Sequence, residues 1–119
     1  MGLFDFLKKK EEVVVNFEEI DSNEKAMELA KKGALAPLYL MPLRFNGPES
    51  VENRLFAPKE VVKLKDRYDD MVEDLLTQGK VSGYSCTPEY KGKSFIPCKL
   101  TIEASKDKEP VFTQIINIW

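Results

Sequence analysis

A single apolar stripe along residues 58–78 is the feature that most constrains how this chain can fold. Its large apolar side chains recur at the three- and four-residue spacing of an α-helix, while the opposite face of the segment is charged. Pro58 suits the first turn of such a helix, and Gly79 suits its end. Because a helix with one apolar stripe must bury it, we expect a helix over 58–78 that packs on another layer. The stripe consists of Val61, Leu64, Tyr68, Met71, Val72, Leu75 and Leu76.

The last third of the chain has an apolar period of two residues, which predicts β-strands. A tight turn centred on Gly92 would place Cys86 opposite Cys98. Strands joined by tight turns are antiparallel, so we expect a three-strand meander. The expected strands span 81–90, 94–104 and 111–119, with a second turn at 106–110, and the inner face of the middle strand carries Ile96, Cys98, Leu100, Ile102 and Ala104.

Shorter elements are expected before the long helix. Asp21, followed by Glu24 three residues later, is typical of a helix N-cap with its reciprocal partner. Gly33 is typical of a helix end, so the spacing predicts a helix over 22–33. Residues 13–17 are β-branched and aromatic at alternate positions, which predicts a strand.

The apolar run 38–45 predicts a further strand. Pro42 places that strand at a sheet edge or at a bulge, because proline cannot donate to a strand ladder. Residues 54–56 are expected to form a short extended piece. This order of elements predicts an α+β fold, in which an antiparallel sheet with the C-terminal meander packs against the long helix 58–78 and the shorter helix 22–33.

Residues 13–119 are expected to form one domain, preceded by an amphipathic segment, residues 1–12. Leu3, Phe4 and Leu7 share one face of this segment, and basic residues follow them. A secretory signal has the reverse order, so we expect a cytoplasmic protein. So few residues bury too little area for stable membrane insertion. Packing on the domain, self-association and reversible contact with a membrane surface remain open for this segment.

The composition argues against several classes of function. The chain has no His, which removes His-based catalytic triads and His-ligated metal sites. Its 18 basic and 20 acidic residues are evenly spread, so it lacks the basic cluster that nucleic-acid binding requires. No glycine-rich phosphate loop is present. We therefore expect no cofactor, no metal, no nucleic-acid partner and no enzymatic activity.

Acidic side chains are dense on the long helix. Asp66, Asp70 and Asp74 lie above one another at four-residue spacing, an arrangement that a hard cation could use. Ligands on one straight helix diverge, however, and Lys65 and Asp69 have the spacing of an ordinary surface ion pair. We therefore interpret this face as solvated and not as a metal site.

The two cysteines are expected to be reduced thiols buried in the core, able to form a cross-strand disulfide on oxidation. A nucleophilic cysteine needs a lowered pKa, which a strand does not provide. An enzyme without His that uses carboxylates or Cys86 is therefore kept only as an alternative.

Two surfaces are candidate binding sites. An aromatic and basic hairpin tip, together with the C-terminal Trp, is the candidate protein-interaction surface, although its two aromatic residues could instead pack on each other across the turn.

The leading hypothesis is a non-enzymatic domain that binds another protein as an immunity protein, inhibitor or adaptor. Alternatives are a small-molecule pocket between long helix and sheet, and a homodimer through an edge strand, either the strand of Pro42 or the last strand. The interaction candidates are Tyr90, Lys91, Lys93, Phe95 and Trp119, and the pocket candidates are Tyr39, Arg44, Tyr68 and Tyr84.

Two stretches resemble other small proteins. The opening from Met1 to Lys9, MGLFDFLKK, resembles the start of small bacterial single-domain proteins, some of which are immunity proteins. The stretch from Pro88 to Pro97, PEYKGKSFIP, is similar to a motif of a small protein family without an assigned activity. The resemblance carries no functional residue to this chain.

Overall fold

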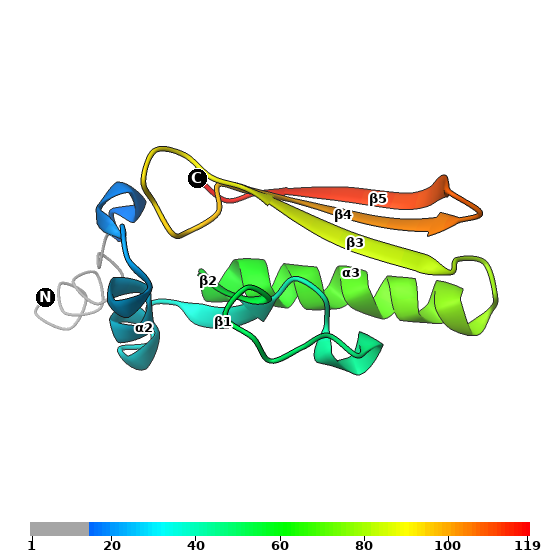
Figure 1. Cartoon of the computed structure of the whole chain (residues 1–119), viewed down its shortest axis with the longest axis horizontal. Helices are drawn as coiled ribbons and strands as arrows, with labels where there is room; N and C mark the ends of the chain where they lie inside the picture. The colour runs from blue at the N-terminus through cyan, green and yellow to red at the C-terminus, as the bar shows by residue number, and fades with distance from the viewer. Residues whose placement is uncertain (1–14) are drawn as a thin grey trace, which may run out of the picture.

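The computed structural model of the chain describes residues 15–119. The expected segment 1–12 and the first two residues of the expected strand 13–17 lie outside the described residues. The described part confirms the α+β class, with two antiparallel sheets and one long helix (Figure 1). The extended piece expected over 54–56 is present as β2. In chain order the elements are the 3₁₀-helix η1 (Phe17–Glu19), α2 (Asn23–Lys31), β1 (Ala36–Tyr39), the 3₁₀-helix η2 (Leu43–Phe45), β2 (Arg54–Ala57), α3 (Lys59–Thr77), β3 (Gly83–Glu89), β4 (Lys99–Lys106) and β5 (Glu109–Asn117).

The elements are arranged in two layers. Strands β3, β4 and β5 form the meander, and β1 and β2 form a separate two-stranded sheet. Figure 1 shows α3 and the β1–β2 pair together on one side of the meander. The core joins the layers, because Leu38 and Ala57 of the small sheet cluster with Leu100, Ile102 and Ile116 of the meander. The inner face of the meander is therefore the surface on which both other parts pack.

Helix α3 confirms the helix predicted over 58–78. Pro58 occupies its N-cap position, and Gly79 follows its end with a left-handed φ of 72°. Val72, at the centre of the apolar stripe, is fully buried in a cluster with Ala104 of β4. The stripe located this helix because its burial against the sheet requires that spacing.

The meander is confirmed, but the register between its first two strands differs from the prediction. Cys86 lies opposite Ile102, and β4 begins one residue after Cys98. Cys98 therefore lies four residues, or about 13 Å along the strand direction, from the position opposite Cys86. Because a disulfide requires Cα atoms within about 7 Å, the expected cross-strand pairing of the cysteines is wrong. Both thiols are free.

A nine-residue loop, 90–98, replaces the expected tight turn. Long-range contacts hold this loop against the N-terminal part of the chain: the Phe95 N–H donates to the Ile20 carbonyl at 2.7 Å, and the Ser94 hydroxyl donates to the Phe17 carbonyl at 2.6 Å. Ile96 is fully buried in the cluster that also contains Ile20. These contacts outweigh the local preference for a two- or three-residue turn. The pairing of β3 with β4 therefore starts outside the loop, at Glu89 and Lys99.

The strand expected over 13–17 is wrong at Phe17, which lies in η1. The Asn16 side chain accepts a hydrogen bond from the Glu18 N–H at 3.1 Å and caps this short 3₁₀-helix. The Phe17 ring stacks on Trp119, with ring centroids 5.6 Å apart. This aromatic contact uses Phe17 as a packing residue at the end of the molecule and not as part of a sheet.

Helix α2 confirms the expected short helix, but its cap is different. The Ser22 hydroxyl accepts from the Lys25 N–H at 3.2 Å and is the N-cap. Asp21, the predicted cap, instead forms an exposed ion pair with the Lys25 ammonium at 2.8 Å. Gly33 follows the helix with φ 83°, as its position predicted.

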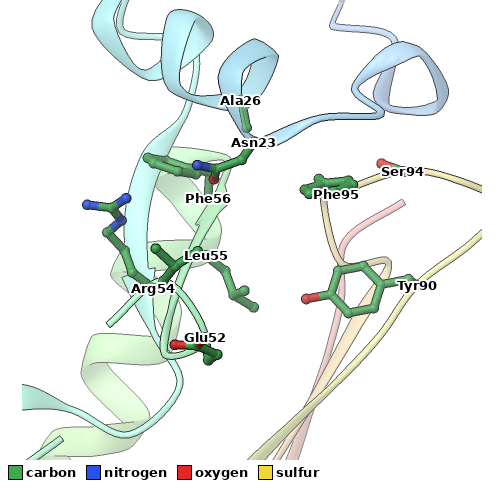
Figure 2. A pocket seen from close by; sticks show the side chains of 10 residues that line it. Asn23, Ala26, Glu52, Arg54, Leu55, Phe56, Tyr90, Ser94 and Phe95 are labelled. Carbon is green, nitrogen blue, oxygen red and sulfur yellow. The ribbon is translucent and has the colours of Figure 1, made fainter. Parts of the chain in front are cut away.

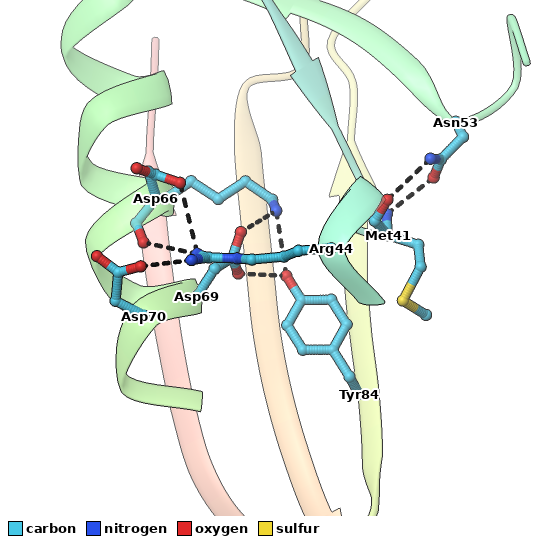
Figure 3. Close-up of polar contacts among 8 residues, drawn as sticks. Met41, Arg44, Asn53, Asp66, Asp69, Asp70 and Tyr84 are labelled. Atoms are coloured by element: carbon cyan, nitrogen blue, oxygen red, sulfur yellow. Dashed lines mark hydrogen bonds and ion pairs between the residues drawn. The ribbon is translucent and has the colours of Figure 1, made fainter. Parts of the chain in front are cut away.

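The strand expected over 38–45 is shorter than predicted, because β1 ends at Tyr39. Pro42 is the N-cap of η2, so it ends the extended segment and does not create a bulge. The buried Asn53 side chain holds the bend by accepting from the Met41 N–H at 2.8 Å and donating to the Met41 carbonyl at 2.9 Å (Figure 3). Apolar periodicity carries no information about such a polar closure.

The second meander turn is confirmed. Asp107 and Lys108 have φ angles of 51° and 70°, which is the geometry of a two-residue type I′ hairpin turn. An irregularity between Ala104 and Ser105 shifts the pairing of β4 with β5 near this turn.

Candidate functional site

A groove of about 390 Å³ lies between β2, the first half of α2 and the loop 90–98 (Figure 2). Figure 2 shows Glu52 and Leu55 on one side of this space, and Tyr90 and Phe95 on the other. We name it the aromatic groove. Its lining residues are Asn23, Ala26, Val51, Glu52, Arg54, Leu55, Phe56, Tyr90, Ser94 and Phe95.

Apolar side chains of the aromatic groove are exposed to water. Val51 is 61% exposed, Tyr90 45% and Phe95 49%. The described residues include seven exposed large apolar side chains, and three of the seven lie in this one groove. Because apolar surface in water costs about 25 cal/mol per Å², such a cluster is typical of a surface that a partner covers.

One edge of β2 borders the groove and is unpaired. No third strand of residues 15–119 joins the β1–β2 sheet. Pro37 lies opposite Phe56 and has no N–H, so the hydrogen-bonded pairs are the neighbouring ones, such as Leu38 with Leu55. The N–H and C=O of Phe56 and the C=O of Arg54 therefore point to the outer edge. Such an edge is a template for an added strand.

The structure separates the five predicted interaction residues. Tyr90 and Phe95 both line the aromatic groove, and burial raises the pKa of the Tyr90 hydroxyl. Lys91 instead donates to the Trp119 carbonyl at 2.7 Å, with its ammonium 5.2 Å from the centre of the indole ring. Trp119 is half-buried and packs within the fold, and Lys93 is exposed outside the groove lining.

Sequence reasoning found one wall of the groove and missed the other. Leu55 was expected only as part of a short extended piece. Val51 was the available signal, because it is an isolated apolar residue in the polar loop between Asn46 and Asn53. Which loop would lie opposite it depends on the tertiary structure.

A buried network of three polar side chains lies between α3 and β3 (Figure 3). The Lys65 ammonium lies 2.7 Å from one Asp69 carboxylate oxygen, and the Tyr84 hydroxyl donates to the other at 2.6 Å. Lys65 also donates to the Tyr84 oxygen at 3.1 Å. Lys65 is 3% exposed and Asp69 4%, so the prediction of a surface ion pair is wrong. The signal was present in their spacing from Val61 and Val72, which places both on the buried face of the helix.

The acidic face of α3 binds the guanidinium group of Arg44 from the same chain. Arg44 of η2 lies 2.5 Å from an Asp70 carboxylate oxygen and 3.7 Å from one of Glu73, and it donates to the Asp66 carbonyl at 3.2 Å. These contacts fasten η2 to α3. In the described part of the chain, no three His, Cys, Asp or Glu side chains form a group suited to a metal ion.

A second hollow, of about 330 Å³, lies between β1, η2 and α3. It brings together two of the four predicted pocket residues, Tyr39 and Arg44, while Tyr84 meets it through the buried network. Tyr68 lies elsewhere, packed edge-on against Phe112 of β5 with ring centroids 6.3 Å apart. On this hollow, Lys65 already bonds to Asp69, and Arg44 donates to the Asp66 carbonyl.

Burial disfavours the loss of a proton from Tyr84 and from Cys86, which lie in or near this network. Burial, reinforced by the hydrogen bond to Asp69, raises the pKa of Tyr84 above its ordinary value. Burial also raises the pKa of the Cys86 thiol to about 11, and the lowering by the Lys65 ammonium is smaller. Cys86 is therefore a protonated thiol near neutral pH, whereas a nucleophilic cysteine is a thiolate.

Comparison with protein-family models, curated proteins and solved structures found no match to this chain. Among the described helices, none combines the length and the apolar character needed to cross a bilayer.

Proposed function

We propose that this chain is a non-enzymatic protein-binding module whose aromatic groove takes an extended apolar segment of a partner protein. One observation supports this function most directly: exposed Tyr90 and Phe95 stand opposite the unpaired edge of β2 in a single groove. An immunity, inhibitor or adaptor role is the finer form of the proposal, and all three require such a contact surface.

The partner segment binds by adding a third strand to the β1–β2 sheet. Its backbone hydrogen-bonds to the outward N–H and C=O of Phe56 and the C=O of Arg54, which supplies affinity independent of sequence. Alternate side chains of the segment contact Leu55, Tyr90 and Phe95, which supplies specificity for apolar residues at every second position.

Peptide selection tests this function. A phage-displayed random library should yield binding peptides that carry apolar residues at every second position. Their affinity is measured by fluorescence anisotropy. The groove variant, Tyr90→Ala with Phe95→Ala, removes two aromatic anchors and should weaken binding about thirtyfold, or about 2 kcal/mol. The control variant, Val111→Ala with Ile115→Ala, removes equally exposed apolar residues of β5 and should change nothing.

Backbone methylation separates strand addition from nonspecific apolar binding. N-methylation of every second peptide amide should abolish binding in one of the two alternations and spare it in the other, because a strand directs alternate amides to its neighbour. If no peptide is selected, or if the groove variant binds every peptide like the unmodified chain, the proposal is wrong.

The alternative of a homodimer through an edge strand has its own test. Light scattering on the chain alone should give a monomer. A dimer that the groove variant dissociates would identify a second copy, and not a different protein, as the occupant of the groove.

A further inference from the structure

We propose that the aromatic groove selects partner segments that carry an acidic residue next to an apolar one, and that Arg54 of β2 binds the carboxylate. This inference rests on the proposed function, because it specifies the chemistry of the strand that the groove takes. The observations that carry it are the unpaired guanidinium of Arg54 and the direction in which its side chain leaves β2.

The guanidinium of Arg54 has no counter-ion in the part of the chain that the structure describes. None of the ion pairs among residues 15–119 includes Arg54, and its Nε is buried without a hydrogen-bond partner. Arg44, by contrast, forms ion pairs with three carboxylates of α3. A buried N–H without a partner is rare, because nothing compensates its loss of water. Arg54 therefore keeps its capacity to bind an anion.

The surroundings of Arg54 do not favour an acidic partner on their own. Glu52 is the acidic residue among those that line the groove, and it forms no ion pair with Arg54. The whole chain has a net charge of −2, so its overall field repels an acidic segment weakly. A preference for acidic segments therefore depends on Arg54 itself.

The side chain of Arg54 leaves β2 on the face opposite to the aromatic wall. Alternate residues of a strand point to opposite faces, so Arg54 shares a face with Phe56, and Leu55 lies on the other. Figure 2 shows the guanidinium of Arg54 pointing away from Tyr90 and Phe95. The outer edge of β2 therefore has an apolar side and a cationic side.

A strand added at this edge has the same alternation and meets both sides. Its residue opposite Leu55 lies on the apolar side, where the proposed function places an apolar residue. The residues before and after that one lie opposite Phe56 and Arg54, on the cationic side. A carboxylate at either position can accept two parallel N–H groups of the guanidinium. The sequence that fits the groove therefore alternates apolar and acidic residues.

The guanidinium is held in place before a partner binds. The Cζ of Arg54 lies 5.5 Å from the centre of the Phe56 ring. The ring is fixed, because Phe56 is buried in the cluster that contains Ile20 and Ala26. A guanidinium held on a fixed ring loses less conformational freedom on binding than a flexible side chain does. This arrangement favours selection of a carboxylate at one place along the groove.

A double-mutant cycle between peptide and protein tests the inference. The selected peptides are synthesised with an amidated C-terminus, so that side chains supply their only carboxylates. Replacing the acidic residue next to an apolar one by Gln or Asn should weaken binding to the unmodified chain about tenfold. The variant Arg54→Met should bind the acidic peptide about tenfold more weakly, and the same peptide replacement should then change its affinity less than twofold. Fluorescence anisotropy measures all four affinities.

Two variants control the cycle. Arg67→Met removes the same group from the exposed surface of α3, outside the groove lining, and should leave both affinities unchanged. Arg54→Lys keeps the charge and loses the paired N–H groups, so it should bind the acidic peptide about threefold more weakly and the amide peptide equally well. Circular dichroism checks that each variant is folded, and Arg54→Lys keeps the cycle measurable if Arg54→Met unfolds.

The outcomes separate the two proposals. If peptides with alternating apolar residues bind the unmodified chain equally with the acid or its amide, the inference is overturned and the proposed function stands. The same holds if the amide weakens binding to the unmodified chain and to Arg54→Met by one factor, because another group then binds the carboxylate. If no peptide binds the unmodified chain, the proposed function fails, and the inference fails with it.

Discussion

The buried network of Lys65, Asp69 and Tyr84 predicts that removing one member costs more stability than removing all three. The perturbations are Lys65→Met, Asp69→Leu and Tyr84→Phe, made singly and together. Each replacement keeps most of the side-chain volume and removes the polar group. The side chains of Lys65 and Asp69 are only 4% and 5% exposed, so water cannot solvate a charge that loses its partner.

The magnitudes follow from what each change leaves behind. Lys65→Met leaves a buried carboxylate with Tyr84 as its remaining partner in the network, which costs about 3–5 kcal/mol, and Asp69→Leu leaves a buried ammonium at similar cost. Tyr84→Phe removes a hydrogen bond to a charged acceptor, worth about 1.5–3 kcal/mol. Added together, these losses would reach roughly 8–13 kcal/mol. The triple variant leaves no unpaired group, so it should lie within about 2 kcal/mol of the unmodified chain.

Urea unfolding followed by far-UV circular dichroism measures these differences, because α3 supplies much of the helical signal. Tyr84→Phe is the mildest single change, and it keeps the comparison possible if a charge-removing variant unfolds. Single variants that each cost less than about 1 kcal/mol, or a triple variant whose loss equals the summed losses, would refute the reasoning.

Three further predictions concern titration and backbone conformation. Folding raises the pKa of Tyr84, so the unfolded chain loses the hydroxyl proton at a lower pH than the folded chain. Stability should therefore fall above about pH 10, by up to about 1.4 kcal/mol per pH unit. Urea unfolding of Tyr84→Phe should show a shallower fall. Cys86, with a pKa of about 11, should react with iodoacetamide at pH 8 about a hundredfold more slowly than a free cysteine, and a rate within threefold, measured by mass spectrometry, would contradict its burial. The double variant Asp107→Asn with Lys108→Gly should be about 1 kcal/mol more stable and should unfold at a higher thermal midpoint, because both positions have positive φ. An unchanged midpoint would argue against the type I′ turn.

Periodicity predicted the elements that are fixed by their own burial. The stripe over 58–78 gave the long helix nearly to the residue, and the two-residue period after Val81 gave three antiparallel strands. Gly33 and the turn at 106–110 were also predicted correctly, since positive φ has a local residue preference. Each of these features is determined either by interactions between residues close in the chain or by the burial of one face of the element.

The candidate site was predictable only in part. Tyr90 and Phe95 were singled out as aromatic residues near a glycine turn, and they do line the groove. The expected register, which placed them in a hairpin tip, was wrong, because Phe95 bonds to Ile20 across most of the chain length. Lys65 was expected at the surface because it was interpreted only as half of an i,i+4 ion pair, although its spacing from Val61 and Val72 places it on the buried face of the helix.

The sequence by itself determined the class of fold, the long helix and the meander, because these follow from which side chains must leave water. Only the tertiary structure decided where the first two meander strands pair and which wall faces β2. Those features depend on contacts between distant segments, such as Ser94 with Phe17, whose free energy no local pattern contains.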